Sequence, residues 1–269
     1  MLSPIAGSRT FARLGPLEVR LAQTAAEIGG AQRLRYQVFF EERHAEGGAA
    51  IRFVQRDVDG FDRLCDHLLV IDHASNGAVV GTTRLLRHDV AQRHGGFYSA
   101  AEFQIGELLA RHRMLRFLEI GRSCVLAPYR TRRTMELLWH GIAAFTERDR
   151  CDVMFGCASL DGTDPEKLAL PLSFLHHHAL SPSPWRARPL AHRRAEMNLM
   201  PAAAIDAKAA LRALPPLIKG YLRLGASVGD GAVVDHAFGT TDVLIMLPMA
   251  SIKQRYYAHF GSKDVSDAA

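Results

Sequence analysis

A carboxylate and a guanidinium lie three residues apart, Glu119 and Arg122, in a stretch that reads as a β-strand. Side chains three apart on a strand point to opposite faces, so the two share one site only if the strand is bulged or splayed between them. Gly121 lies between them, and a glycine inside a strand pattern is typical of a bulge. A buried glutamate needs a hydrogen-bond partner or a function. The alternative is an ordinary strand with two solvent-facing charges.

A loop further upstream is strongly acidic. Its ten residues "DVDGFDRLCD" carry four aspartates: Asp57, Asp59, Asp62 and Asp66. Such a run can bind a metal ion or a substrate ammonium, and an acidic surface turn explains it equally well. On the preceding helical segment, Arg35 lies one turn before Phe39, so both share a face. The simpler interpretation of Arg35 is a solvated charge.

The turn after the strand is rich in arginine. With the residue just before the strand, it supplies four arginines: Arg116, Arg130, Arg132 and Arg133. These arginines and the backbone N–H groups at the start of the next helix suit a phosphate group. A coenzyme A site of the common N-acetyltransferase type needs glycines here to approach a pyrophosphate, and this turn has none. The turn therefore favours a donor with a single phosphate, or one held elsewhere.

Other chemistries find less support in the sequence. Three consecutive histidines in "LHHHAL" (175–180) point in different directions on a helix, so we expect no metal site. GxSxG, HExxH, P-loop and GxGxxG motifs are absent, which argues against the commoner hydrolases and nucleotide-binding proteins. The four cysteines show no CxxC spacing and are expected to be reduced core thiols: Cys65, Cys124, Cys151 and Cys157.

Hydrophobic periodicity predicts the elements that position these residues. We expect strands at 17–23, 68–72, 78–88, 115–128, 152–159 and 240–248, with a strand-like region at 185–200. We expect helices from an N-cap at Thr24 to about Arg43, from Thr131 to about Arg148, over 164–180 with an interruption at Pro171, and over 214–226. Asn76-Gly77 favours a two-residue hairpin turn. This order predicts an α/β fold with a mixed, mostly antiparallel sheet flanked by helices.

Length and composition allow one large domain. The 269 residues, 48% of them hydrophobic, can bury a sizeable core. We expect a loose N-terminal tail at 1–16, one domain with a C-terminal elaboration over 17–260, and a C-terminal tail at 261–269. The sequence predicts neither a membrane-spanning helix nor a secretory signal, so we expect a cytoplasmic protein. The net charge of +5 indicates an acidic partner: nucleic acid, an anionic membrane surface or an acidic carrier protein.

Seven motifs, taken together, resemble bacterial L-ornithine Nα-acyltransferases, which are related to the acyl-homoserine lactone synthases. The motifs are, in order, "LRYQVF", "DVDGFD", "VVGTTRLL", "FYSAAEF", "LEIGRSCVLAPYR", "FGCASLDGTDP" and "LPPLIKGYLRLGA". The similarity spans about residues 18–250. It implies the Gcn5-related N-acyltransferase fold, with a splayed central strand pair. It also implies transfer of a 3-hydroxyacyl chain from acyl carrier protein to the α-amine of L-ornithine, giving lyso-ornithine lipid.

The resemblance also implies roles for single residues. Matching the synthase pattern gives these substrate-binding positions: Arg35, Phe39, Asp59, Asp62, Arg84 and Arg122. The Glu-x-x-Arg pair of the synthases matches Glu119 and Arg122. The synthases carry aromatic residues where this chain has Leu118 and Ser123, so we expect an acceptor pocket of different shape, and no S-adenosylmethionine chemistry is carried over.

The mechanism that follows from the resemblance is thioester aminolysis. Glu119 is the expected base, and a backbone N–H near Ser123, Cys124 or Val125 is expected to stabilise the oxyanion. The four arginines of the turn are expected to dock the acidic carrier and the phosphate of its phosphopantetheine. We expect no permanently bound cofactor, because the phosphopantetheine enters as part of the donor. Acyl carrier protein and L-ornithine are the expected partners, without nucleic acid, and peripheral contact with the inner membrane surface is compatible with the basic charge.

Three alternatives stay open at this point. An acyl-CoA-dependent N-acetyltransferase of a small amine would prefer acetyl-CoA to acyl carrier protein. An acyl-homoserine lactone synthase would use S-adenosylmethionine in place of ornithine. A basic nucleic-acid-binding module would bind in a salt-dependent way that survives Glu119→Gln, but it leaves the acidic loop unexplained.

Overall fold

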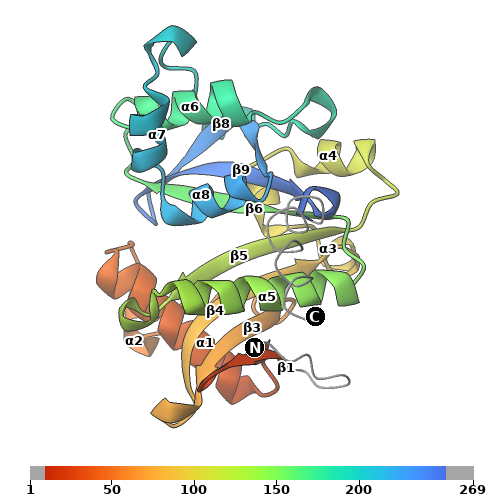
Figure 1. The fold of residues 1–269 in the computed structure, drawn as a ribbon, viewed down its shortest axis with the longest axis vertical. Coiled ribbons are helices and arrows are strands. Elements are labelled where there is room, and N and C mark those ends of the chain that lie inside the picture. The colour runs from red at the N-terminus through yellow and green to blue at the C-terminus, as the bar shows by residue number, and fades with distance from the viewer. Residues whose placement is uncertain (1–9, 253–269) are drawn as a thin grey trace, which may run out of the picture. The chain divides into compact units, whose positions relative to one another are not determined.

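The structure, a computed structural model, describes residues 10–252. The chain divides into two compact units. The first holds residues 1–96 and 118–151, and the second holds residues 97–117 and 152–269. Each unit combines antiparallel strands with helices, so the expected α/β fold with a mostly antiparallel sheet is confirmed (Figure 1).

The first unit is built on five strands in the order β1-β2-β3-β4-β5, each antiparallel to the next. The strands are β1 (Thr10–Leu14), β2 (Leu17–Leu21), β3 (Asp66–Asp72), β4 (Ala78–Arg87) and β5 (Phe117–Val125). The helices are α1 (Ala25–Tyr36), a π-helical turn (Gln37–Glu42), α2 (Ala49–Val54), α3 (His88–Arg93) and α5 (Arg132–Arg148). A single connection therefore carries the chain from β2 through α1, the π-helical turn and α2 to β3.

The two main helices of this unit pack on opposite faces of the strands. Ala31 of α1 packs in one cluster with Leu69 of β3. Gly141 of α5 lies so close to Leu68 that an added Cβ would come within 3.1 Å of that side chain. Because neighbouring residues of a strand point to opposite faces, α1 and α5 cover different sides of β3. The side that faces α1 also carries the charged residues described below.

Side-chain caps begin both helices where the sequence places them. The Thr24 side chain accepts a hydrogen bond from the backbone N–H of Glu27 at the start of α1. The Thr131 side chain accepts one from the N–H of Thr134 at the start of α5. Each cap satisfies an N–H group that has no partner inside the helix. The N-cap predicted at Thr24 and the helix start predicted at Thr131 are confirmed.

The second unit carries the strand order β6-β9-β8-β7, again antiparallel throughout. The strands are β6 (Val153–Asp161), β7 (Arg194–Ala195), β8 (Ser227–Asp235) and β9 (Thr240–Pro248). The helices are α4 (Ile105–Arg111), α6 (Ala169–Ala179), α7 (Ala207–Ala213) and α8 (Pro216–Arg223). No helix within residues 10–252 is long and apolar enough to cross a bilayer.

Several expectations need correction. Residues 10–14 form β1, which pairs with β2, so the tail predicted for 1–16 is wrong over this stretch. Five residues, not two, connect β3 to β4, although Asn76 and Gly77 do adopt positive φ. Pro171 does not interrupt α6, because it is the third residue of that helix, where a missing N–H costs nothing. Within the strand-like region at 185–200, only the two residues of β7 are a strand.

Other expectations stay predictions. The N-terminal residues 1–9 and the C-terminal residues 253–269, which include the predicted tail at 261–269, lie outside the described residues. The single domain over 17–260 and the splayed central strand pair are not tested. All four cysteines are free, as expected; two are buried and two are half-buried.

Candidate active site

Arg35 is the centre of a buried ion network in the first unit. It projects from α1 with only 1% of its surface exposed. Its Nε donates to Asp57 at 2.8 Å, and its Nη2 donates to Asp62 at 2.9 Å. Nη2 also donates to the backbone carbonyl of Asp57. The interpretation of Arg35 as a solvated charge is therefore wrong.

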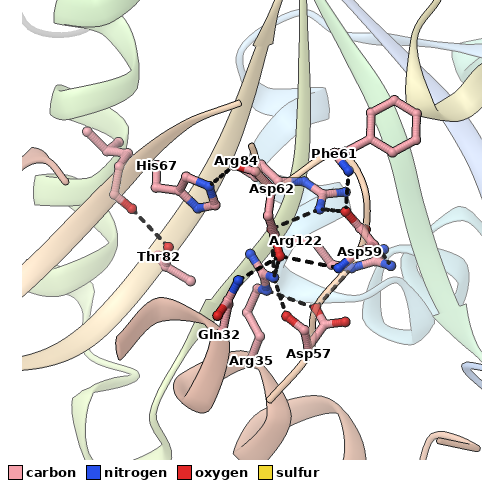
Figure 2. A network of polar contacts seen from close by, with 11 residues as sticks. Gln32, Arg35, Asp57, Asp59, Phe61, Asp62, His67, Thr82, Arg84 and Arg122 are labelled. Atoms are coloured by element: carbon pink, nitrogen blue, oxygen red, sulfur yellow. Dashed lines mark hydrogen bonds and ion pairs between the residues drawn. The ribbon is translucent and has the colours of Figure 1, made fainter. Parts of the chain in front are cut away.

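Two further arginines complete the network from neighbouring strands (Figure 2). Arg84 of β4 is 4% exposed, and its Nη1 donates to Asp59 at 2.6 Å and to Asp62 at 3.2 Å. Arg122 of β5 donates to Asp57 at 3.2 Å and lies 3.7 Å from Asp59. Three arginines thus meet three aspartates, so the charges balance and the cost of burying them is offset in pairs.

The acidic loop is fixed by its own hydrogen bonds. Asp59 accepts from the backbone N–H of Phe61 at 2.8 Å, and Asp62 accepts from Gln32 of α1 at 2.9 Å. His67 of β3 donates from Nε2 to the carbonyl of Asp62 at 2.8 Å. The loop is therefore an ordered wall of the site. Within residues 10–252, no group of three or more His, Cys, Asp and Glu side chains could hold a metal ion.

Burial and charge act on the two central ionisable groups in opposite ways. Burial alone raises the pKa of Asp62, but the Arg35 charge, the Gln32 hydrogen bond and the Arg84 charge hold that pKa below its ordinary value. Burial lowers the pKa of His67, and its hydrogen bond to Asp62 only partly opposes this. Asp62 is therefore ionised and His67 neutral at pH 7.

A bulge in β5 brings Arg122 to the network. Arg84 of β4 lies opposite Gly121, and Thr82, two residues earlier, lies opposite Cys124, three residues later. One extra residue is therefore accommodated in β5, as predicted for this strand. Arg122, not Gly121, takes the positive φ of 52°. This turns its side chain to the face where it meets Asp57.

Glu119 shares the face of the sheet that carries the network. It lies opposite Leu86, two residues beyond Arg84 along β4, and paired or alternate residues point to the same side. Glu119 is buried, with 4% exposure. It interacts electrostatically with the Cys65 thiol, which also interacts with Asp59, Asp62 and Arg84. The solvent-facing alternative for Glu119 is therefore wrong. Beside it, a Cβ added at Gly121 would meet open space.

The side chains of Ser123 and Cys124 are both engaged in other contacts. The Ser123 hydroxyl hydrogen-bonds to the Thr83 hydroxyl at 2.5 Å. Cys124 packs with Leu34 and Val38 of the first helical segment, and burial raises the pKa of its thiol to about 12. Neither side chain is suited to act as a nucleophile. The expected oxyanion role of the backbone here stays a prediction.

Phe39 lies in the π-helical turn after α1, partly buried against Leu34, Val38 and Cys124. A π-helical turn inside a helical segment shifts the register of the residues that follow it. Phe39 is thus placed next to Cys124, beside the bulged part of β5.

The four predicted docking arginines do not lie in one unit. Arg130 donates to the carbonyl of Val125 at 2.9 Å and pairs with Glu42. Arg132 pairs with Glu136 one turn along α5 and is largely exposed, and Arg133 is exposed beside it. Arg116 belongs to the second unit, and its backbone N–H donates to Asp152 at 2.8 Å. The common basic surface stays a prediction.

Three members of the site were not predicted as site residues: Gln32, Asp57 and His67. Gln32 precedes Arg35 by three residues on α1, so helical spacing could have linked the two. Asp57 was noted in the acidic run but not assigned to the site. His67 lies two residues before Leu69, so both side chains point to the α1 side of β3. This strand periodicity was the only feature of the sequence that could have placed His67 near the site.

Comparisons with known proteins assign the chain to a family. A family model described as "Acetyltransferase (GNAT) domain" matches residues 34–140. The chain is 55% identical over 261 residues to the L-ornithine N(alpha)-acyltransferase of Rhizobium meliloti (strain 1021), covering 95% of this chain and 88% of the relative. It is 42% identical over 243 residues to the protein of the same name from Rhodobacter capsulatus, covering 89% of this chain and 92% of that relative.

Among solved structures, the chain resembles FeeM, an N-acyl amino acid synthase from uncultured soil microbes. That match has 9% sequence identity and a TM-score of 0.48, and it covers 89% of this chain and 94% of FeeM. The relatives of high identity decide the assignment, and they confirm the resemblance seen in the motifs. The chain belongs to the L-ornithine N(alpha)-acyltransferase family.

Proposed function

We propose that this protein transfers a 3-hydroxyacyl chain from the thioester of acyl carrier protein to the α-amine of L-ornithine, giving lyso-ornithine lipid. One observation carries the proposal within this family: the β5 bulge puts Arg122 and the buried Glu119 on the same face, against a loop that carries three aspartates of the ion network. A carboxylate and an arginine beside open space suit an amino acid substrate, which presents one ammonium and one carboxylate.

Glu119 acts as the general base in this reaction. The α-ammonium of ornithine must lose a proton before its nitrogen can attack, and Glu119 takes that proton directly or through a water. The nitrogen then bonds to the thioester carbon and loses its second proton, the C–S bond breaks, and the leaving thiolate takes up that proton. A positioned base of this kind supplies roughly 10²- to 10⁴-fold in rate.

The three arginines divide into positioning and binding roles. Arg35 and Arg84 are almost fully buried and each contacts two aspartates, so they hold the acidic loop in place. Arg122 has 15% of its side chain exposed, and its ion pair to Asp59 is long, at 3.7 Å. Arg122 is therefore the residue that binds the ornithine carboxylate. Asp59, with 24% of its side chain exposed, faces the substrate ammonium groups.

The donor is recognised outside this network. The arginine-rich turn after β5 meets the acidic carrier and its phosphopantetheine phosphate. A backbone N–H between residues 123 and 125 stabilises the oxyanion that forms on the thioester carbonyl. The thiolate leaves with the carrier, so the reaction needs no resident cofactor.

The test uses purified protein, L-ornithine and either 3-hydroxyacyl carrier protein or acetyl-CoA, with acylated ornithine measured by mass spectrometry. We expect product from the carrier-bound donor and a loss of roughly 10²- to 10⁴-fold in Glu119→Gln. Glu166→Gln, at an exposed glutamate of the second unit, is the matched control and should keep full activity. Equal amounts of product from the wild type and Glu119→Gln would show that Glu119 is not the general base. Rapid turnover with acetyl-CoA and none with acyl carrier protein would contradict the proposal that acyl carrier protein is the donor.

A further inference from the structure

Helix α2 and the residues after it, 49–58, form a protruding segment with an apolar outer side, called here the α2 segment. None of the six residues of α2 is buried. Phe53 is 90% exposed, Val54 49% and Val58 47%. These are three of the five large hydrophobic residues described as exposed in residues 10–252, and they fall within six positions. Single exposed apolar residues are normal on a soluble protein, but a cluster of this kind indicates an interaction surface.

Basic side chains surround the apolar ones. Arg52 precedes Phe53, and Arg56 lies between Val54 and Val58; both arginines are exposed. The Arg56 guanidinium and that of Arg33 both lie near Gly29 of α1, at 3.5 and 3.6 Å from the position of an added Cβ. No acidic residue occurs between positions 47 and 56. The patch thus combines an exposed aromatic ring with a local excess of positive charge.

The α2 segment is held by packing at its start and by a hydrogen bond at its end, so its outer side remains exposed to solvent. Gly47 allows close approach at the start: a Cβ there would lie 3.0 Å from the Phe40 ring and 3.3 Å from Ile51. At the other end the backbone N–H of Asp57 donates to the carbonyl of Gln32 in α1 at 3.1 Å. Asp57 then binds Arg35 in the ion network. The apolar side chains therefore project from a segment tied to the site.

We propose that the α2 segment is a membrane-interface element, with Phe53, Val54 and Val58 inserted at the headgroup boundary of an anionic lipid bilayer. Phenylalanine with neighbouring arginines is the composition that favours this boundary, because the ring leaves water while the guanidinium groups meet lipid phosphates. Binding of an acidic carrier protein would account for the exposed arginines but not for the exposed ring of Phe53. Docking at this segment places the ion network close to the bilayer, where an amphipathic product can leave the protein.

Vesicle binding tests this without any substrate, so the result does not depend on the proposed acyl transfer. The full chain is sedimented with vesicles of phosphatidylcholine alone or mixed with phosphatidylglycerol. We expect binding to the mixed vesicles that weakens about tenfold in Phe53→Ser, from loss of the buried ring, and about fivefold in Arg52→Gln or Arg56→Gln, from loss of one charge near the surface.

Met114→Ser is the matched control, since Met114 is 92% exposed and belongs to the second unit. It should bind vesicles as the wild type does. A Phe53→Trp variant should show a blue shift of its added fluorescence with mixed vesicles. The inference is overturned if the wild type does not bind mixed vesicles, or if Phe53→Ser and Met114→Ser bind equally. It is also overturned if Phe53→Ser keeps vesicle binding and weakens binding to acyl carrier protein.

Discussion

At the scale of single residues, the arginines of the ion network differ in what surrounds them. Arg35 is 1% exposed and bound by Asp57 and Asp62, while Arg122 keeps 15% of its side chain in contact with solvent. A charge removed from a buried pair leaves its partner charge uncompensated, which is strongly destabilising. The same change at a partly exposed arginine costs much less, because solvent screens the remaining charge. Stability and substrate binding can therefore be separated within one network.

We expect Arg35→Gln to lower the free energy of unfolding by about 3–5 kcal/mol, since Asp57 and Asp62 lose their shared partner. Arg122→Gln should change that free energy far less and should instead raise the KM for ornithine. Urea denaturation gives the first quantity and steady-state kinetics the second. A large loss of stability in Arg122→Gln with an unchanged KM would assign this arginine to the structure alone.

The sequence predicted a bulge between Glu119 and Arg122, and the register of β5 against β4 confirms the bulge. It did not predict which residue takes the positive φ, because glycine is the usual choice and the ion pair to Asp57 outweighs that preference here. Arg35 was interpreted as solvated, because a helix pattern does not show which distant loop will cover it. Its partners lie 22 and 27 residues away.

At the scale of elements, the sequence predicted the features that depend on neighbouring residues, such as where the two main helices begin. Thr24 and Thr131 begin their helices because each side-chain oxygen accepts a hydrogen bond from the backbone N–H three residues later. Such a bond forms within the segment and needs no tertiary contact. Strand β8 was not predicted, because glycines at 229 and 231 interrupt its hydrophobic alternation. Gly229 is required by packing: an added Cβ would lie 2.8 Å from the carbonyl oxygen of Ala187. Such a requirement is visible only once the chain is folded.

Gly141 of α5 gives an element-scale prediction in which two effects oppose each other. Replacing a helical glycine by alanine gains about 1 kcal/mol of helix propensity. The new Cβ, however, would lie 2.5 Å from Val19 of β2, in a region with no room to relax, and overpacking costs about 1–3 kcal/mol. We therefore expect Gly141→Ala to be less stable than the wild type in thermal unfolding.

Gly220 in α8 is the control for that change. A Cβ at this position meets nothing within 4 Å, so Gly220→Ala should gain stability by about 0.5–1 kcal/mol. If Gly141→Ala gained stability as Gly220→Ala does, the close packing of α5 on β2 would be wrong. The comparison holds the chemical change constant and varies only the space around it.

At the scale of the whole molecule, the buried and paired acids set how stability depends on pH. Glu27 in the first unit has its pKa lowered to about 2, chiefly by its hydrogen bond with Arg20, against an ordinary value of 4.5. Glu102 in the second unit has its pKa raised, because it is buried and lies near Asp242. The two groups therefore act on folding with opposite signs.

The sign follows from which state binds the proton more readily. Below its ordinary pKa the unfolded chain protonates Glu27 while the folded protein does not, so the stability that Glu27 supplies is present above pH 4.5 and is lost as pH falls toward about 2. For Glu102 the folded protein holds the proton longer. Its ionisation therefore opposes folding increasingly as pH rises from 4.5 through the raised value.

We expect these slopes in urea denaturation of two variants between pH 3 and pH 8. Glu27→Gln should be less stable than the wild type at pH 7, and the difference should shrink steadily below pH 4.5. Glu102→Gln loses the contacts with Cys157 and Arg193, so its absolute stability is not the readout. Its stability relative to the wild type should rise with pH above 4.5, because the buried charge is absent from the variant. A Glu102→Gln difference that stays flat across this range would mean that the carboxyl of Glu102 keeps an ordinary pKa when buried, and the environment assigned to it in the second unit would then be wrong.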